Sequence, residues 1–138
     1  MSTEKLFQIR FLAKAERLSL VRVLVKEMAE SVGCCVELSE KLVIAVNEAC
    51  MNIIQHAYKG DESGEIVFEM LNNEKELHFR LVDYACPIDL NSVKPRDLND
   101  IRPGGLGTHF ITEIMDEHSM GHLNEGEGNY LNMKKKIN

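Results

Sequence analysis

Hydrophobic and polar residues recur along the chain in patterns that predict five strands and three helices. The segment Leu6–Leu12 alternates between the two kinds of residue and is predicted to be a strand. A helix is predicted from about Glu16 to Val32, because apolar residues repeat there at helical spacing: Leu20, Leu24, Met28 and Val32. Gly33 is predicted to end this helix, since glycine is common just past a helix C-terminus.

A second helix is predicted from about Ser39 to Tyr58, with Ser39 as its N-cap. One face of this helix is apolar and carries Leu42, Val46, Ala49, Ile53 and Ala57. A turn-forming cluster, Lys59–Gly64, separates it from two alternating segments, Glu65–Leu71 and Glu76–Asp83. The four residues between these segments complete the pattern of a β-hairpin.

The last third of the chain begins with an irregular stretch, Cys86–Gly107, which is long enough to be a functional lid or disordered. A short helix from about Thr108 to Glu117 is predicted next, then strands near His118–Leu123 and Asn129–Lys136 around a turn. The order of elements separates helices from strands. It predicts an α+β fold in two layers, with a mixed, mostly antiparallel sheet and helices on one face.

Length and charge narrow the class of protein. The 138 residues fit one domain spanning 1–138, with 44% hydrophobic and 28% charged residues. The sequence contains no apolar run near the roughly 20 residues that cross a bilayer, so we expect a cytoplasmic protein. A net charge of −6 argues against a general nucleic-acid binder, and Lys134–Lys136 are interpreted as a solvated strand end.

The cysteines and histidines do not form a recognisable metal motif. None of Cys34, Cys35, Cys50 and Cys86 has C-x-x-C spacing, and most are predicted to be buried as small apolar residues. His118 and His122 have no acidic partner in an H-E-x-x-H arrangement and are interpreted as surface or strand residues. Zinc binding is therefore not expected.

Three groups of polar residues and glycines are candidates for chemistry. Glu48 and Asn52 are four residues apart and project from one face of the second helix, in a row that extends to His56. This row is either a functional site or the solvated side of an amphipathic helix. Asp83 ends an alternating strand on its inner side, where its carboxylate either accepts from a ligand such as adenine or caps the following turn.

The third group is the run Pro103-Gly104-Gly105-Leu106-Gly107-Thr108 before the short helix. Glycines let backbone N–H groups approach an anion, and a helix N-terminus attracts negative charge. The run is not a Walker A loop, because Gly-Lys-Ser/Thr is missing. A dinucleotide fingerprint is also excluded, because the run comes late in the chain and Phe110 replaces its third glycine.

Taken in order, these groups resemble the N-box, the Asp-bearing box and the glycine-rich box of the histidine-kinase-like ATPase superfamily (the Bergerat ATP-binding fold). The run from Ala45 to Tyr58 is especially similar to the N-box of bacterial anti-sigma factor serine kinases. The resemblance covers nearly the whole chain. Only about fifteen residues precede the first helix, which fits this stand-alone branch better than two-component kinases.

The resemblance implies ATP and Mg²⁺ as ligands and assigns roles to particular residues. Glu48 would be the general base for a seryl hydroxyl, and Asn52 would hold Mg²⁺. The residues implied in nucleotide binding are Asn52, Asp83, Ala85, Gly104, Gly105, Leu106, Gly107 and Thr108. The implied partners are a sigma factor and an anti-sigma-factor antagonist, and a homodimer is also implied. The first strand is short and apolar, so its edge is either shared between two chains or blunted by Lys5 and Arg10 in a monomer.

Ala85 departs from the family pattern, which has glycine two residues after the aspartate. Its methyl group lies near the expected adenine site and resists positive φ. Two hypotheses therefore stand. In one the chain is an ATP-dependent serine kinase, which Glu48 and Asn52 favour; in the other it is a partner-binding module with little or no phosphotransfer, which Ala85 favours.

Overall fold

The computed structural model describes residues 3–86, 106–123 and 128–137. Within these residues five strands and three α-helices follow one another in the predicted order. They are β1 (Glu4–Leu12), α1 (Leu18–Ser31), α2 (Val36–Asn52), β2 (Glu65–Asn72), β3 (Glu76–Asp83), α4 (Leu106–Ile114), β4 (Glu117–His122) and β5 (Asn129–Lys136). A 3₁₀ turn (Ala15–Arg17) precedes α1, and a π-helical segment (Ile53–Ala57) follows α2.

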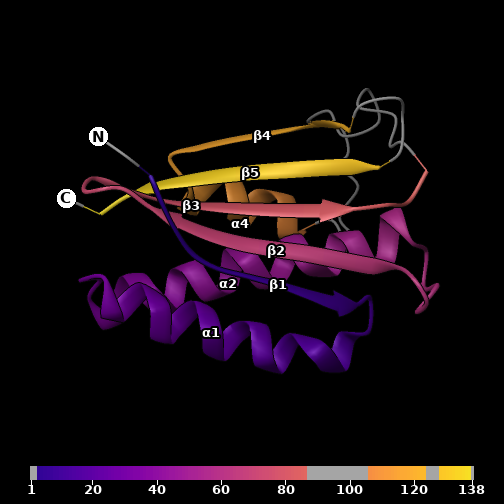
Figure 1. The fold of residues 1–138 in the computed structure, drawn as a ribbon, viewed down its shortest axis with the longest axis horizontal. Coiled ribbons are helices and arrows are strands. Elements are labelled where there is room, and N and C mark those ends of the chain that lie inside the picture. Colours follow the sequence, from indigo (N-terminus) through magenta and orange to yellow (C-terminus); the bar gives the residue numbers. More distant parts are fainter. Residues whose placement is uncertain (1–2, 87–105, 124–127, 138) are drawn as a thin grey trace.

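The strands form one five-stranded sheet in the order β1-β2-β3-β5-β4, and every described strand pair is antiparallel. The helices lie together on one face of this sheet, with α2 between α1 and α4 (Figure 1). The two-layer α+β fold predicted from the sequence is therefore confirmed, although the sheet is antiparallel in every described pair and not mixed.

The core fills the space between the helices and the sheet. Alternate residues of β2 and β3 are fully buried there, and the rings of Phe68 and Phe79 stack with their centroids 6.5 Å apart. The predicted apolar face of α2 is buried at Leu42, Val46 and Ala49. Because side chains alternate along a strand, the same pattern carries Asp83 at the end of β3 to the helix side of the sheet.

The apolar repeat that predicted α1 coincides only in part with the face that this helix buries, since Met28 and Val32 pack partly buried against the core. Leu20 is 57% exposed, and the residues that α1 buries are Leu18, Val21, Val25 and Ala29. A strict four-residue repeat drifts by about 40° per step around a helix with 3.6 residues per turn. The buried set mixes steps of three and four residues and so stays on one face.

The start of α2 also differs from the prediction. Its N-cap is Cys35, and Ser39 lies inside the helix, where it is fully buried. The Ser39 hydroxyl lies 2.7 Å from Glu30 Oε2 and 2.8 Å from the Val36 carbonyl. Ser39 therefore joins α2 to α1 instead of capping the first turn.

The cysteines are less buried than predicted. Cys34 and Cys50 are buried, whereas Cys35 and Cys86 are exposed, and all four are free thiols. Burial raises the pKa of the Cys50 thiol to about 12, so this residue behaves as a small apolar side chain. Of the helices described, none is both long and apolar enough to span a membrane.

Candidate functional site

The last two turns of α2 present the first part of the candidate site. Glu48 and Asn52 lie one turn apart and are both half-buried. Directly after Asn52 the helix widens into the π-helical segment, where the Tyr58 N–H donates to the Ile53 carbonyl at 2.9 Å. His56 lies on this segment and is exposed, so the polar row that begins at Glu48 reaches solvent there. Such π-helical turns often occur at functional sites.

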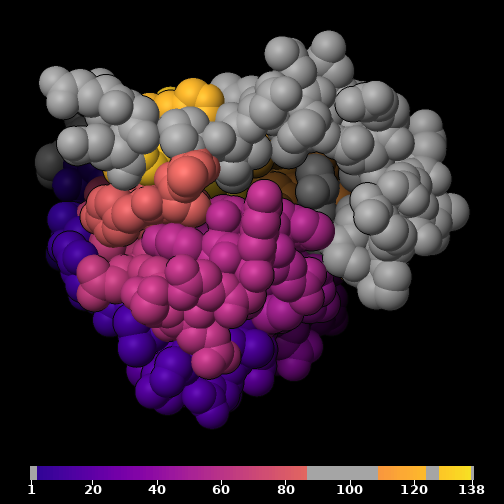
Figure 2. Space-filling model, turned by 90° about the vertical axis from the view of Figure 1, so that its right-hand side faces the viewer, coloured from indigo at the N-terminus to yellow at the C-terminus, as the bar shows by residue number. Residues whose placement is uncertain are grey.

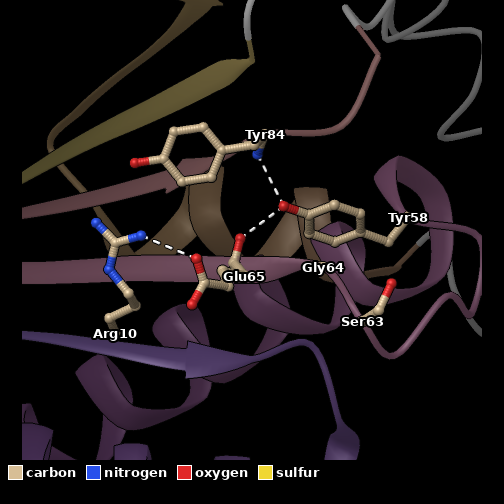
Figure 3. A pocket seen from close by; sticks show the side chains of 6 residues that line it. All are labelled: Arg10, Tyr58, Ser63, Gly64, Glu65 and Tyr84. Carbon is tan, nitrogen blue, oxygen red and sulfur yellow. Dashed lines mark hydrogen bonds and ion pairs between the residues drawn. The ribbon is translucent and has the colours of Figure 1, made fainter.

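Tyr58 fixes the end of this helical segment to the sheet. Its hydroxyl donates to the carbonyl of Glu65 at 2.6 Å and accepts from the N–H of Tyr84 at 2.8 Å (Figure 3). A Cβ at Gly64 would overlap the Tyr58 ring, so glycine is needed for this close approach. Burial raises the pKa of Tyr58, which keeps the hydroxyl protonated as a donor. The helix end is thereby held against the start of β2 and the end of β3.

Asp83 is the buried carboxylate at this end of the sheet, with 3% of its surface exposed. Its Oδ1 accepts from the Asn129 side-chain amide at 2.9 Å and from the Ala85 N–H at 3.1 Å. Burial raises the pKa of Asp83, and these two donors oppose that effect. The inward position predicted from the strand pattern is confirmed, and the turn-capping bond considered as its alternative is present as well. Both bonds end on Oδ1, so Oδ2 is the oxygen suited to accept from a ligand.

Ala85 fits the conformation that the chain adopts here. Among the described non-glycine residues only Lys59 has a positive φ, so residue 85 does not need the left-handed conformation that favours glycine. The Ala85 side chain is buried, and its N–H holds Asp83. The backbone strain expected from the departure at this position is therefore absent.

The structure describes the glycine-rich group only in part. Gly104 and Gly105 lie outside the described residues. Leu106, Gly107 and Thr108 form the first turn of α4, which begins two residues earlier than predicted and packs beside α2. Figure 2 looks onto the end of the molecule where α2 and β3 finish, and there the surface at the end of β3 adjoins that of the segment after α2.

An open cavity of about 490 Å³ lies beside this site, lined by Arg10, Tyr58, Ser63, Gly64, Glu65 and Tyr84 (Figure 3). Arg10 is paired with Glu65 at 2.9 Å, and its guanidinium lies 5.9 Å from the centre of the Tyr84 ring. None of Glu48, Asn52 and Asp83 lines the cavity. Tyr58 and Tyr84 line it, so the cavity adjoins the predicted site without containing these three residues.

Sequence reasoning missed two residues that shape the site. Tyr58 lay inside the N-box run without an assigned role, and Asn129 was read only as the start of a strand. Pairing β3 with β5 in register places Asn129 opposite Asp83. An asparagine opposite an inward-facing aspartate is the signal that would have identified it. For metals, no group of three or more His, Cys, Asp or Glu side chains gathers anywhere in the described ranges.

The whole of this architecture matches a known family. The model of the histidine kinase-like ATPase domain matches residues 11–135 of the chain. The protein therefore belongs to the histidine kinase-like ATPase family.

Curated relatives place the chain in the branch of serine-protein kinases. The chain is 37% identical to the serine-protein kinase RsbW of Listeria monocytogenes serovar 1/2a over 134 residues, covering 91% of this chain and 83% of the relative. It is 33% identical to the serine-protein kinase RsbW of Bacillus cereus over 138 residues, covering 94% and 84%. A solved SiaB–SiaC complex from Pseudomonas aeruginosa has the same fold, with a TM-score of 0.68 at 11% identity, covering 97% of this chain and 91% of that one.

Proposed function

We propose that the protein is an ATP-dependent serine-protein kinase and anti-sigma regulatory factor. It phosphorylates an anti-sigma-factor antagonist on serine and binds a sigma factor. The observation that carries this proposal is the placement of Glu48 and Asn52 at the end of α2. Tyr58, on the segment that follows α2, binds the backbone N–H of Tyr84, next to the buried Asp83. The RsbW relatives, which match over most of both chains, support the same activity.

The purine base of ATP is assigned to Asp83. Its Oδ2 accepts from the exocyclic amino group of adenine, since Oδ1 is already engaged by Asn129 and Ala85. A carboxylate with a fixed orientation at the end of a strand is a selective acceptor, because a base with a carbonyl at that position would place two acceptors together. Ala85 takes part through its backbone N–H, which orients the carboxylate.

The phosphates are assigned to the space between α2 and the start of α4. The backbone N–H groups of Gly105 and Gly107 are proposed to contact them, with Gly104, Leu106 and Thr108 completing the run. The N-terminus of α4 adds a favourable dipole. The half-buried Asn52 carries a carboxamide oxygen, a hard ligand that suits Mg²⁺, and this ion keeps most of its other ligands as water and phosphate oxygens. When bound, Mg²⁺ neutralises charge on the phosphates.

Glu48 is assigned the proton transfer. The seryl hydroxyl of the antagonist gives its proton to the Glu48 carboxylate as its oxygen bonds to the γ-phosphorus of ATP. The bond between the γ-phosphorus and the bridging β–γ oxygen breaks, and the products are phosphoserine and ADP. Phosphoryl transfer depends mainly on positioning and charge neutralisation, which a glutamate one turn from Asn52 can assist.

The alternative of a partner-binding module without phosphotransfer rested on Ala85. The structure removes the backbone part of that argument, because Ala85 adopts its conformation without a positive φ and supports Asp83. Nothing else in the described residues favours this alternative.

A homodimer is proposed through β1. This strand pairs only with β2 in the described sheet, which leaves its other edge available for a second copy. Lys5 and Arg10 form salt bridges with Glu69 and Glu65 of β2, so both cations are held on the side away from that edge. Light scattering over a concentration series distinguishes a dimer from a monomer.

A cytoplasmic location is proposed because all four cysteines are free thiols.

Phosphotransfer from labelled ATP with Mg²⁺ to the cognate antagonist tests the activity. Glu48→Gln is expected to lower the rate by about 10²- to 10⁴-fold without weakening ATP binding. Glu40→Gln is the matched control, since Glu40 lies on the same helix and is exposed. No transfer by the wild-type protein, or equal rates for Glu48→Gln and Glu40→Gln, refutes the proposed mechanism.

A further inference from the structure

Three side chains form a row across the last three strands of the sheet. Asp83 on β3 is in register with Asn129 on β5, and Asn129 is in register with His122 on β4. Asn129 is 4% exposed and Asp83 is 3% exposed, whereas His122 is exposed at the surface. The row therefore runs from the buried carboxylate to the outer edge of the sheet.

Hydrogen bonds connect the row from end to end. Asn129 Nδ2 donates to Asp83 Oδ1 at 2.9 Å and to the Cys86 carbonyl at 3.4 Å. At its other side, Asn129 Oδ1 lies 3.1 Å from His122 Nδ1. An ionised carboxylate only accepts, so the Asn129 amide must turn its nitrogen to Asp83 and its oxygen to His122. The His122 ring then carries a proton on Nδ1 and donates it to Asn129.

The backbone beside this row is closely packed at Gly128. Gly128 precedes Asn129, and a Cβ at Gly128 would overlap the carbonyl oxygen of Asp83. The backbone at Gly128 therefore lies directly against the end of β3.

We propose that Asn129 is a positioning residue for base recognition, and that His122 holds its amide in the required orientation. Asn129 keeps Oδ1 of Asp83 engaged, so that Oδ2 points to the ligand as an acceptor for a purine that carries an amino group at position 6. The inference rests on the proposed function, in which Asp83 accepts from adenine. Selection of adenine over guanine then depends on Asn129 and His122, which do not touch the base.

Calorimetric titration with ADP and with GDP, both with Mg²⁺, tests the inference. Asn129→Ala is expected to weaken ADP binding at least about tenfold, because a bond to a charged group is lost, and to leave GDP binding unchanged. His122→Ala is expected to weaken ADP binding about two- to tenfold. His122→Asn is expected to restore it, because its amide nitrogen can donate from the same place. His118→Ala is the matched control, an exposed histidine on the same strand that contacts Thr112.

The ratio of ADP to GDP affinity separates positioning from a general loss of structure, since unfolding weakens both ligands equally. If Asn129→Ala does not fold, the exposed His122 variants carry the test alone. If Asn129→Ala and His122→Ala both keep the wild-type ratio of ADP to GDP affinity, the inference is overturned and the proposed function stays intact. If the wild-type protein does not bind ADP, or if Asp83→Asn binds ADP with full affinity, the proposed function is refuted and the inference with it.

Discussion

Tyr58→Phe removes the hydroxyl that ties the end of the α2 segment to the sheet. The variant loses the bond to the Glu65 carbonyl, at 2.6 Å, and the bond from the Tyr84 N–H, at 2.8 Å. Each neutral hydrogen bond contributes about 0.5–1.5 kcal/mol to folding. Water replaces part of the bond at the exposed Tyr84, so we expect a loss of about 1–2 kcal/mol in the free energy of unfolding.

Urea denaturation measures this loss directly, and thermal melting follows it as a fall of about 3–8 °C for a chain of this size. Tyr84→Phe is the matched control. Tyr84 is 47% exposed and joins Tyr58 through its backbone, so its hydroxyl can be removed at a cost below about 0.5 kcal/mol. ADP affinity should fall in Tyr58→Phe and stay unchanged in Tyr84→Phe, because the Tyr84 N–H adjoins Asp83. Equal stability and equal ADP affinity of the two variants would show that Tyr58 does not position the site.

Three further changes test other parts of the account. Gly64→Ala places a Cβ against the Tyr58 ring, and its melting temperature should fall by at least as much as that of Tyr58→Phe, with wild-type melting as the contrary result. Asp83→Asn removes a buried carboxylate whose pKa is raised in the folded state. The wild-type protein therefore loses stability as the pH rises through that raised pKa, whereas the variant does not. Urea denaturation should show Asp83→Asn to be more stable than wild type at pH 7, with a difference that disappears toward pH 3; a difference independent of pH contradicts this. Ser39→Ala should cost about 1–3 kcal/mol, read from urea denaturation, because its buried hydroxyl joins α2 to Glu30; unchanged stability contradicts this.

Alternation and helical period were enough to predict the fold because most of the core follows them. The hairpin of β2 and β3 needs only local alternation, and Asp83 could be placed on the inner side by counting along its own strand. Glu48 and Asn52 shared a face for the same reason, since four residues make about one turn of a helix. These features depend on residues close together in the sequence.

The features that were missed depend on residues far apart in the chain. Ser39 matches a capping residue by type, yet it pairs with Glu30 on the preceding helix and the cap falls at Cys35. Asn129 meets Asp83 across 46 positions, and the bond depends on the register of β3 and β5. The exposure of Leu20 follows from which side of α1 packs on α2. Such contacts are set by tertiary packing, which local propensity does not encode.

We propose that one nucleotide site joins the end of α2, the end of β3 and the start of α4. A crystal structure with Mg²⁺ and a non-hydrolysable ATP analogue tests it most directly. We predict that the adenine amino group lies on Asp83 Oδ2, Mg²⁺ on Asn52, and the phosphates on the backbone N–H groups of Gly105 and Gly107. The analogue bound in the cavity of Arg10 and Tyr84, or with its base away from Asp83, would contradict it.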